Sequence, residues 1–113
     1  MERRFRLTRL KDFQRVRQYG KNYAHPLIVL IVAPNNLEWA RFGITAGRSI
    51  GNAVQRNRSK RLLRAAVNTL LINISRGYDV ILIARRALLE ANYQQVEGAL
   101  KDLLQQAGLL NSE

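Results

Sequence analysis

The sequence predicts one α+β domain, spanning residues 1–113, in which helices pack on a central and mostly antiparallel sheet. A chain of 113 residues is long enough for one hydrophobic core. Two segments rich in β-branched apolar residues, 27–33 and 78–84, are typical of buried strands. Two longer segments, 52–75 and 92–108, repeat apolar residues at the three- and four-residue spacing of amphipathic helices.

In the first half of the chain we expect a helix over residues 9–19, with Thr8 as its N-cap and Gly20 at its end. Residues 27–33 follow as a strand buried on both faces, and the next residues, Pro-Asn-Asn, predict a turn. Residues 39–46 alternate apolar and polar side chains, which favours a strand with one wetter face. The two strands are therefore expected to form a hairpin.

The second half begins with a polar connection that ends at Asn52, a favourable N-cap for a helix reaching about residue 75 and closed by Gly77. Residues 78–84 predict another buried strand, and the last helix is capped by Asn92 and closed by Gly108. The expected order is helix, hairpin, helix, strand, helix, with the helices forming one layer on the sheet.

The composition is strongly basic, with 19 Lys or Arg, 8 Asp or Glu and a formal net charge of +11. Such a surface attracts polyanions, so nucleic acid is the first expected partner and an anionic membrane the second. The longest apolar run is seven residues, too short to span a bilayer. The absence of cysteine fits a reducing compartment, and the N-terminal segment does not resemble a secretion signal, so we expect a cytoplasmic protein.

The strongest local signal is segment 56–64, R-N-R-S-K-R-L-L-R, with five cations in nine residues. On a helix these cations spread over about half the circumference, opposite the apolar stripe. A solvated face that only maintains solubility normally mixes charges of both signs. Here no carboxylate lies between Glu38 and Asp79, so we favour contact with RNA or DNA, to which Asn57 and Ser59 could add neutral hydrogen bonds.

A second basic set lies in the N-terminal tail and first helix: Arg3, Arg4, Arg6, Arg9, Lys11, Arg15 and Arg17. Aromatic residues are interleaved with it, namely Phe5, Phe13, Tyr19 and Tyr23, a combination that suits single-stranded nucleic acid. Phe13 and Tyr19 could equally anchor the helix to the sheet, and both roles remain open. Trp39 and Phe42 are expected in the core.

Catalysis by the protein itself has little support. His25 is the only histidine, and the eight acidic residues are scattered singly, without the spacing that metal-dependent nucleases use to bind ions. The glycines at 43, 47 and 51 are not followed by the Lys-Ser/Thr pair of a phosphate-binding loop. We therefore predict no catalytic residue and no metal or cofactor bound by the protein.

Segment 50–64, I-G-N-A-V-Q-R-N-R-S-K-R-L-L-R, resembles the signature of the bacterial ribonuclease P protein subunit. The resemblance extends to Arg6-Leu7 and Asp12-Phe13 near the start, to Phe42-Gly43-Ile44, and to residues 78–85. It therefore spans nearly the whole chain in the expected order.

This resemblance implies that a large catalytic RNA is the partner and that the complex removes the 5′ leader of precursor tRNA by hydrolysis. The RNA and its Mg²⁺ ions would perform the reaction, with the protein as a monomeric subunit of the ribonucleoprotein. The fold implied is similar to domain 2 of ribosomal protein S5, with an unusual left-handed strand-helix-strand crossover.

The resemblance also implies site residues. The RNA subunit would contact the long helix and its approach through Arg48, Asn52, Arg56, Asn57, Arg58, Lys60, Arg61 and Arg64. A cleft between the first helix and the sheet would hold the leader through Phe13, Arg9 and Arg17.

The chain departs from the family pattern at three places. Gly47-Arg48-Ser49 replaces the frequent Ser-Lys-Lys, so Arg48 stands alone there. Arg17 and Ile31 occupy positions where other members often carry aromatic residues. Stacking in the cleft would then rest on Phe13, and Arg17 would pair with phosphate.

Two other functions remain as alternatives. A non-enzymatic RNA-binding protein of ribosomal type would explain the same charge without a catalytic partner. A protein-only nuclease would require converging acidic residues, which the sequence does not suggest.

Overall fold

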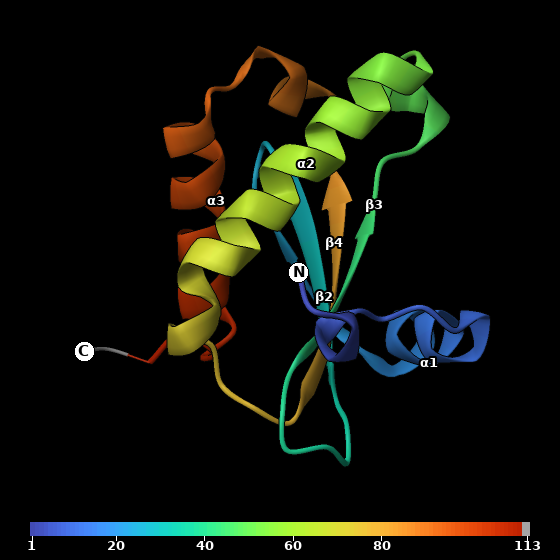
Figure 1. Cartoon of the computed structure of the whole chain (residues 1–113), viewed down its shortest axis with the longest axis vertical. Coiled ribbons are helices and arrows are strands. Elements are labelled where there is room, and N and C mark those ends of the chain that lie inside the picture. Colours follow the sequence, from blue (N-terminus) through green and yellow to red (C-terminus); the bar gives the residue numbers. More distant parts are fainter. Residues whose placement is uncertain (112–113) are drawn as a thin grey trace.

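The computed structural model describes residues 1–111 and shows α-helices packed on both faces of a four-stranded sheet (Figure 1). The helices are α1 (Leu10–Tyr19), α2 (Ala53–Leu70) and α3 (Tyr93–Gln106). The strands are β1 (Lys21–Ala24), β2 (Ile28–Pro34), β3 (Arg41–Thr45) and β4 (Tyr78–Ala84). Short 3-10 helices cover Arg3–Phe5, Arg48–Ile50, Leu71–Asn73 and Arg86–Glu90. The predicted α+β class is confirmed.

The strands lie in the order β1-β2-β4-β3. β2 pairs antiparallel with both β1 and β4, whereas β3 pairs parallel with β4. The predicted hairpin between segments 27–33 and 39–46 is therefore wrong, because β4 lies between them. β2 and β4 carry apolar residues toward both faces and take the two central positions, while β3, with the polar Arg41 and Thr45, lies at an edge.

The parallel pair requires a crossover, and α2 supplies it between β3 and β4. In Figure 1 both strands point upward, β4 lies to the left of β3, and α2 passes in front of the sheet. When the helix lies in front of the sheet, a crossover from one upward strand to a parallel strand on its left is left-handed. About 98% of crossovers between parallel strands are right-handed, so this one is an exception. The handedness implied by the family resemblance is confirmed.

The sheet separates two apolar clusters. Ile28, Leu30, Val80 and Leu82 face α2 and α3 in the larger cluster. The alternate residues, including Ile31 and Ile81, meet Val16 of α1 on the other face. The helices thus form two layers rather than the single layer predicted, because both faces of the central strands are apolar.

The helix ends confirm some predictions and correct others. Asn52 and Asn92 are the N-caps of α2 and α3, and each accepts a hydrogen bond from a backbone N–H in a capping box. The first helix begins after Arg9, which makes no side-chain cap, so Thr8 is not its cap. Gly20 does end it.

Two further boundaries differ from expectation. α2 ends at Leu70 and tightens into the 3-10 helix, so it does not reach residue 75, and Gly77 (φ 85°) lies in the turn before β4. β1 was not predicted, because this four-residue edge strand has mixed polarity and no clear alternation.

One buried carboxylate joins the smaller layer to the sheet. Asp79 of β4 is 0% exposed and accepts hydrogen bonds from Arg15 of α1, Arg41 of β3 and Asn35 of the β2–β3 loop. Asp12 of α1 lies 3.5 Å from the Arg41 guanidinium and adds a second negative charge. Two acids and two arginines therefore fix α1 against the β3–β4 edge.

The electrostatics of Asp79 follow from this geometry. Burial raises the pKa of Asp79, but hydrogen bonds from Arg41 and Asn35 and the charges of Arg41 and Arg15 outweigh it, so the net pKa is lowered. The hydrogen bond to Asp79 correspondingly raises the pKa of Arg41. The ionised pair is thus the stable form of the folded protein.

We predict that Asp79→Asn lowers the free energy of unfolding by about 3 kcal/mol at neutral pH, because it leaves two arginines without their buried partner. Since folding lowers the pKa of Asp79, its stabilising contribution is complete above about pH 5 and is lost as the pH falls through the folded pKa. Urea unfolding of both proteins from pH 7 down to pH 3 measures this, and the difference between them should shrink on acidification.

The matched control is Asp102→Asn on the exposed face of α3, which should change the unfolding free energy by less than about 0.5 kcal/mol. Equal effects of the two substitutions at pH 7 would contradict the structural role of Asp79.

Candidate nucleic-acid interface

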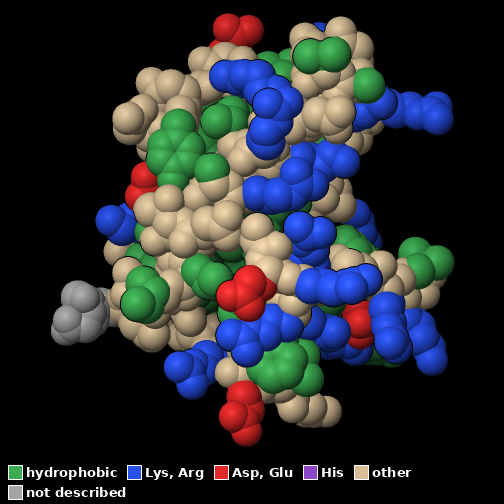
Figure 2. Space-filling model, in the orientation of Figure 1, with side chains coloured by type: hydrophobic (Ala, Val, Ile, Leu, Met, Phe, Trp, Pro, Cys, Tyr) green, Lys and Arg blue, Asp and Glu red, His purple; other side chains and the backbone are tan. Residues whose placement is uncertain are grey.

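The long helix α2 has a core side and a cationic side. Its buried residues are Ser59, Leu63, Ala66, Val67 and Leu70. The opposite side exposes Asn57, Arg58, Arg61, Arg64 and Asn68, while Arg56 and Lys60 lie half-buried at one flank. Figure 2 shows Lys and Arg side chains gathered over the upper part of α2 and in the region below it. Within residues 1–111, none of the α2 cations forms a salt bridge with a carboxylate.

Ser59 differs from the expectation that it contacts nucleic acid. Its side chain is 0% exposed, and its hydroxyl donates to the backbone carbonyl of Gln55, 3.0 Å away. Position 59 falls on the apolar stripe, four residues before Leu63 and seven before Ala66, so helix geometry itself places it inside. Asn57 remains on the exposed side.

The start of α2 is tightly organised. The Oδ1 atom of Asn52 accepts from the backbone of Gln55, and Arg56 Nη1 donates to the carbonyl of Gly51 at 2.8 Å. Gly51 has φ 139°, which disfavours any residue with a side chain, and a Cβ there would collide with the Gln55 amide. Asn52 and Arg56 are thus held by local bonds, and Arg48 is exposed on the 3-10 helix just before them.

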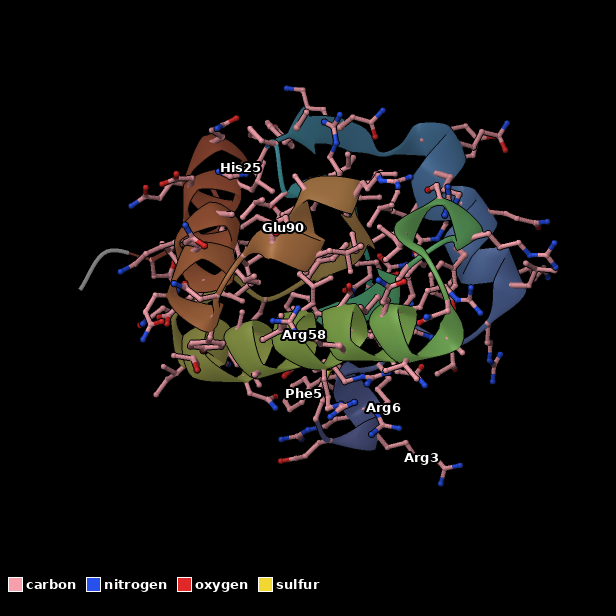
Figure 3. The ribbon with its side chains drawn as sticks, turned by 90° about the horizontal axis from the view of Figure 1, so that it is seen from above. Arg3, Phe5, Arg6, His25, Arg58 and Glu90 are labelled. Carbon is pink, nitrogen blue, oxygen red and sulfur yellow. The ribbon has the colours of Figure 1, made fainter. Side chains whose placement is uncertain are left out.

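The remaining cations of α2 point in different directions. The Nη2 atom of Arg58 lies 3.5 Å from the carbonyl of Ala91, so this side chain turns toward the segment after β4 (Figure 3). Arg64 turns the other way and lines a hollow of about 290 Å³ together with Arg6 and Phe13. The basic face of α2 therefore continues into neighbouring elements on both sides.

The N-terminal 3-10 helix approaches α2 across two hollows that both elements line, and Figure 3 shows Arg3, Phe5 and Arg6 on the same side of the molecule as α2. Arg6 and Arg64 line one hollow, and Arg4 and Asn68 line another. Arg4 and Arg6 of the N-terminal set thus adjoin the cationic side of α2, and we call the two together the α2 surface. The sequence did not show this juxtaposition, because it depends on how the tail returns across the sheet edge, where Leu7 bonds to the carbonyl of Phe42.

The residues expected at the leader site lie along α1. Arg9, Phe13 and Arg17 follow one another at four-residue intervals, which places them on one stripe about 12 Å long. Arg9 and Arg17 are exposed, whereas Phe13 is half-buried, and Ile31 is buried beneath α1. Phe13 therefore anchors the helix and still presents part of its ring.

Other members of the N-terminal set have different surroundings. Arg15 is held by Asp79 and by the Pro34 carbonyl, so it is part of the ion-pair network rather than a free phosphate ligand. Tyr19 is 75% exposed and does not anchor the helix. Tyr23 packs half-buried against the larger core cluster. Phe42 lies in the core as predicted, but Trp39 is only half-buried.

Neither a cluster of metal-ligating side chains nor a membrane-spanning helix is found in the part of the chain that the structure describes. Across residues 1–111 no three or more His, Cys, Asp or Glu side chains gather in a way that could hold a metal ion. His25 Nδ1 accepts a hydrogen bond from the backbone of Leu27. None of the helices in this part of the chain has the length and apolarity to cross a membrane.

A mixed sheet with a left-handed crossover and a carboxylate-free cationic helix define the chain as an α+β protein with a strongly basic helix surface. Residues 1–108 match the model of a family described as Ribonuclease P. The chain is 44% identical over 109 residues to the ribonuclease P protein component of Herpetosiphon aurantiacus, covering 96% of this chain and 89% of the relative. The chain belongs to the ribonuclease P protein family and is thus a tRNA-processing protein component.

Solved structures agree with this assignment. The ribonuclease P protein of Staphylococcus aureus superposes with a TM-score of 0.86 at 30% identity, covering 95% of this chain and 98% of that one. The protein from Thermotoga maritima gives a TM-score of 0.82 at 28% identity, with coverages of 89% and 96%. The fold described above is therefore the fold of this family.

We predict that Gly43→Ala destabilises the protein by about 1–3 kcal/mol and displaces Phe13, because a Cβ at this position would lie 2.5 Å from the tip of the Phe13 ring. Gly98→Ala in α3 is the control, since a Cβ there has no neighbour within 4 Å and should stabilise the helix slightly. Thermal unfolding of both variants measures this. An unchanged melting temperature for Gly43→Ala would contradict the close packing of Phe13 on β3.

Proposed function

We propose that this protein binds the RNA subunit of ribonuclease P through the α2 surface and the 5′ leader of precursor tRNA along α1. The RNA subunit, with Mg²⁺, then hydrolyses the phosphodiester that joins the leader to the tRNA. The observation that carries this proposal is the separation of α2 into a buried stripe and a cationic side free of carboxylates.

The charge distribution supports phosphate binding. Arginine presents a planar fork of donors that fits phosphate oxygens, and each phosphate neutralised releases counterions from the RNA. We assign RNA-subunit contacts to the residues Arg48, Asn52, Arg56, Asn57, Arg58, Lys60, Arg61 and Arg64. Since Asn52 and Arg56 already bond within the helix start, their role is to fix the approach to α2 as well as to meet RNA.

The α1 stripe suits a single strand. Arg9 and Arg17 supply exposed positive charges at its ends, and the partly exposed Phe13 ring lies between them. An aromatic face between two cations allows one base to stack while neighbouring phosphates pair. We therefore assign Phe13, Arg9 and Arg17 to the leader.

The protein's acidic residues do not suit direct catalysis. Asp12 and Asp79 lie near each other but both are paired with Arg15 and Arg41. A carboxylate committed to two arginines is a poor ligand for a catalytic cation. We accordingly assign bond cleavage and the Mg²⁺ requirement to the RNA-containing complex, in which one copy of this protein acts in the cytoplasm.

The direct experiment assembles the purified protein with a bacterial ribonuclease P RNA and measures removal of the leader from precursor tRNA at low Mg²⁺. We expect cleavage well above that of the RNA alone and none with the protein alone. Binding without stimulation would indicate a ribosomal-type RNA-binding protein, and cleavage by the protein alone would indicate a protein-only nuclease. Either outcome would contradict the proposal.

We predict that Arg61→Gln weakens binding to the RNA subunit and makes the dependence of log K on log salt concentration shallower by about 0.7 to 0.9, the amount expected for one lost phosphate contact. Filter binding at several salt concentrations measures both quantities. Lys101→Gln on the exposed face of α3 makes the same charge change away from the α2 surface and should leave the slope unchanged. Equal slopes for both variants would argue against α2 as the contact.

We predict that Phe13→Leu lowers the affinity of the assembled complex for precursor tRNA by about 1–3 kcal/mol, the value of one stacked base. Leucine keeps the apolar packing against Gly43 and Leu7 but removes the aromatic face. Affinity for mature tRNA, which lacks the leader, should be unchanged. An equal loss for both RNAs would mean that Phe13 serves only the packing of α1.

A further inference from the structure

A groove of about 830 Å³ lies between the N-terminal 3-10 helix, the β2–β3 loop and the end of α2. It combines flat, apolar and polar groups, among them Arg4, Phe5, Trp39, Asn68, Ile72 and Arg76. Glu2 and Glu38 also line it, so its two arginines are matched by two acids. Net charge therefore does not drive binding here, unlike on the cationic side of α2.

The side chain of Arg4 is stacked in this groove. Its Cζ atom lies 4.9 Å from the centre of the Phe5 ring and 5.9 Å from that of Trp39. The Glu2 carboxylate lies 3.4 Å from Arg4 Nε and forms an ion pair with it. The Trp39 indole donates to the backbone carbonyl of Arg4 at 2.8 Å, which fixes the indole ring. The cluster is thus organised without any ligand.

Part of the stacked cluster remains open to solvent. The Arg4 side chain is 60% exposed despite its two aromatic neighbours, and Trp39 is only half-buried. A guanidinium plane or an aromatic ring with an open face is a surface on which an unpaired nucleobase stacks. A base needs no net positive charge at its site, which agrees with the balanced charges of the groove.

The groove continues the cationic side of α2. Asn68 follows Arg64 by four residues and Arg61 by seven, so all three share the exposed side of the helix, and Asn68 also lines the groove. Phe5 of the N-terminal 3-10 helix lines the same groove as Asn68. An RNA backbone that runs along the α2 arginines toward the helix C-terminus therefore arrives at Arg4 and Trp39.

We propose that Arg4, Phe5 and Trp39 form a stacking site for one unpaired base of the RNA bound along α2, with the Asn68 amide in reach of the base edge. This inference rests on the proposed RNA contact of α2 but concerns a different kind of contact: stacking in a neutral groove rather than phosphate pairing. Continuity with the cationic face favours a nucleobase over an apolar protein segment as the occupant.

Trp39 is the only tryptophan, so its fluorescence reports directly on this groove. The experiment titrates the full-length protein with ribonuclease P RNA and follows tryptophan emission beside an independent filter-binding assay. We expect quenching that saturates together with binding. Binding with unchanged emission would overturn the stacking site while leaving the RNA contact of α2 intact, and no binding at all would overturn both.

The variant Arg4→Lys separates stacking from charge. It keeps the positive charge and the backbone carbonyl that accepts the hydrogen bond from the Trp39 indole, but it removes the planar guanidinium group. We expect RNA affinity about tenfold weaker, within the range for one stacked base, with an unchanged salt slope and reduced quenching. The control Arg86→Lys makes the same exchange at an exposed position after β4 and should bind as the unmodified protein does.

Equal affinities for the two variants would overturn the stacking role of Arg4. A changed salt slope in Arg4→Lys would mean that Arg4 contacts phosphate instead, which also overturns it. Unfolding midpoints of both variants are measured in parallel. If Arg4→Lys loses RNA affinity only in proportion to its loss of stability, the cluster serves to hold the N-terminal turn in place, and the stacking site is overturned.

Discussion

The buried carboxylate of Asp79 is the interaction on which the arrangement of the remaining elements depends. It joins α1, β3 and the β2–β3 loop to the centre of the sheet, and it does so through arginines and an asparagine rather than through apolar packing alone. The α1 layer is small, with Val16 as its one buried residue, so apolar burial alone holds it weakly. The ion-pair network therefore sets where α1 presents Phe13, and it also pairs Asp12 and Asp79 with arginines.

The second constraint is that α2 has a buried apolar side and an exposed cationic side. The buried stripe ties the helix to the sheet and to α3, so the cationic side is held rigidly rather than on a flexible tail. A rigid set of cations loses little conformational entropy when it meets a folded RNA. The N-terminal turn then adds Arg4 and Arg6 to the same surface, which brings the α2 cations next to the groove that contains Arg4 and Trp39.

Much of the fold follows from local patterns in the sequence. The apolar runs placed β2 and β4, and the two Asn caps placed the starts of α2 and α3, because these signals act within a few residues. The pairing of strands is not local: nothing in residues 27–46 shows that β4 enters between β2 and β3, and a short loop between two strands favours a hairpin.

The candidate site also has features that local sequence predicts and features that depend on tertiary structure. The cations of α2 could be assigned to one side from helical spacing, yet the same spacing should have placed Ser59 inside. The pairing of Arg15 with Asp79, 64 residues apart, and the approach of Arg4 to Trp39 depend on tertiary structure. The sequence therefore identified the cationic helix but not the surface that it forms with the N-terminal turn.

The most direct test of the central claim uses the absence of cysteine from the chain. A single cysteine introduced as Ala65→Cys on the exposed side of α2 carries a tethered iron chelate, and Gln105→Cys on the exposed side of α3 carries the same probe as a control. With α2 docked against the RNA, we expect hydroxyl radicals from the α2 probe to cut ribonuclease P RNA at a few discrete positions, and those from the α3 probe to make no such cuts. Discrete cuts from α3 with none from α2 would contradict it.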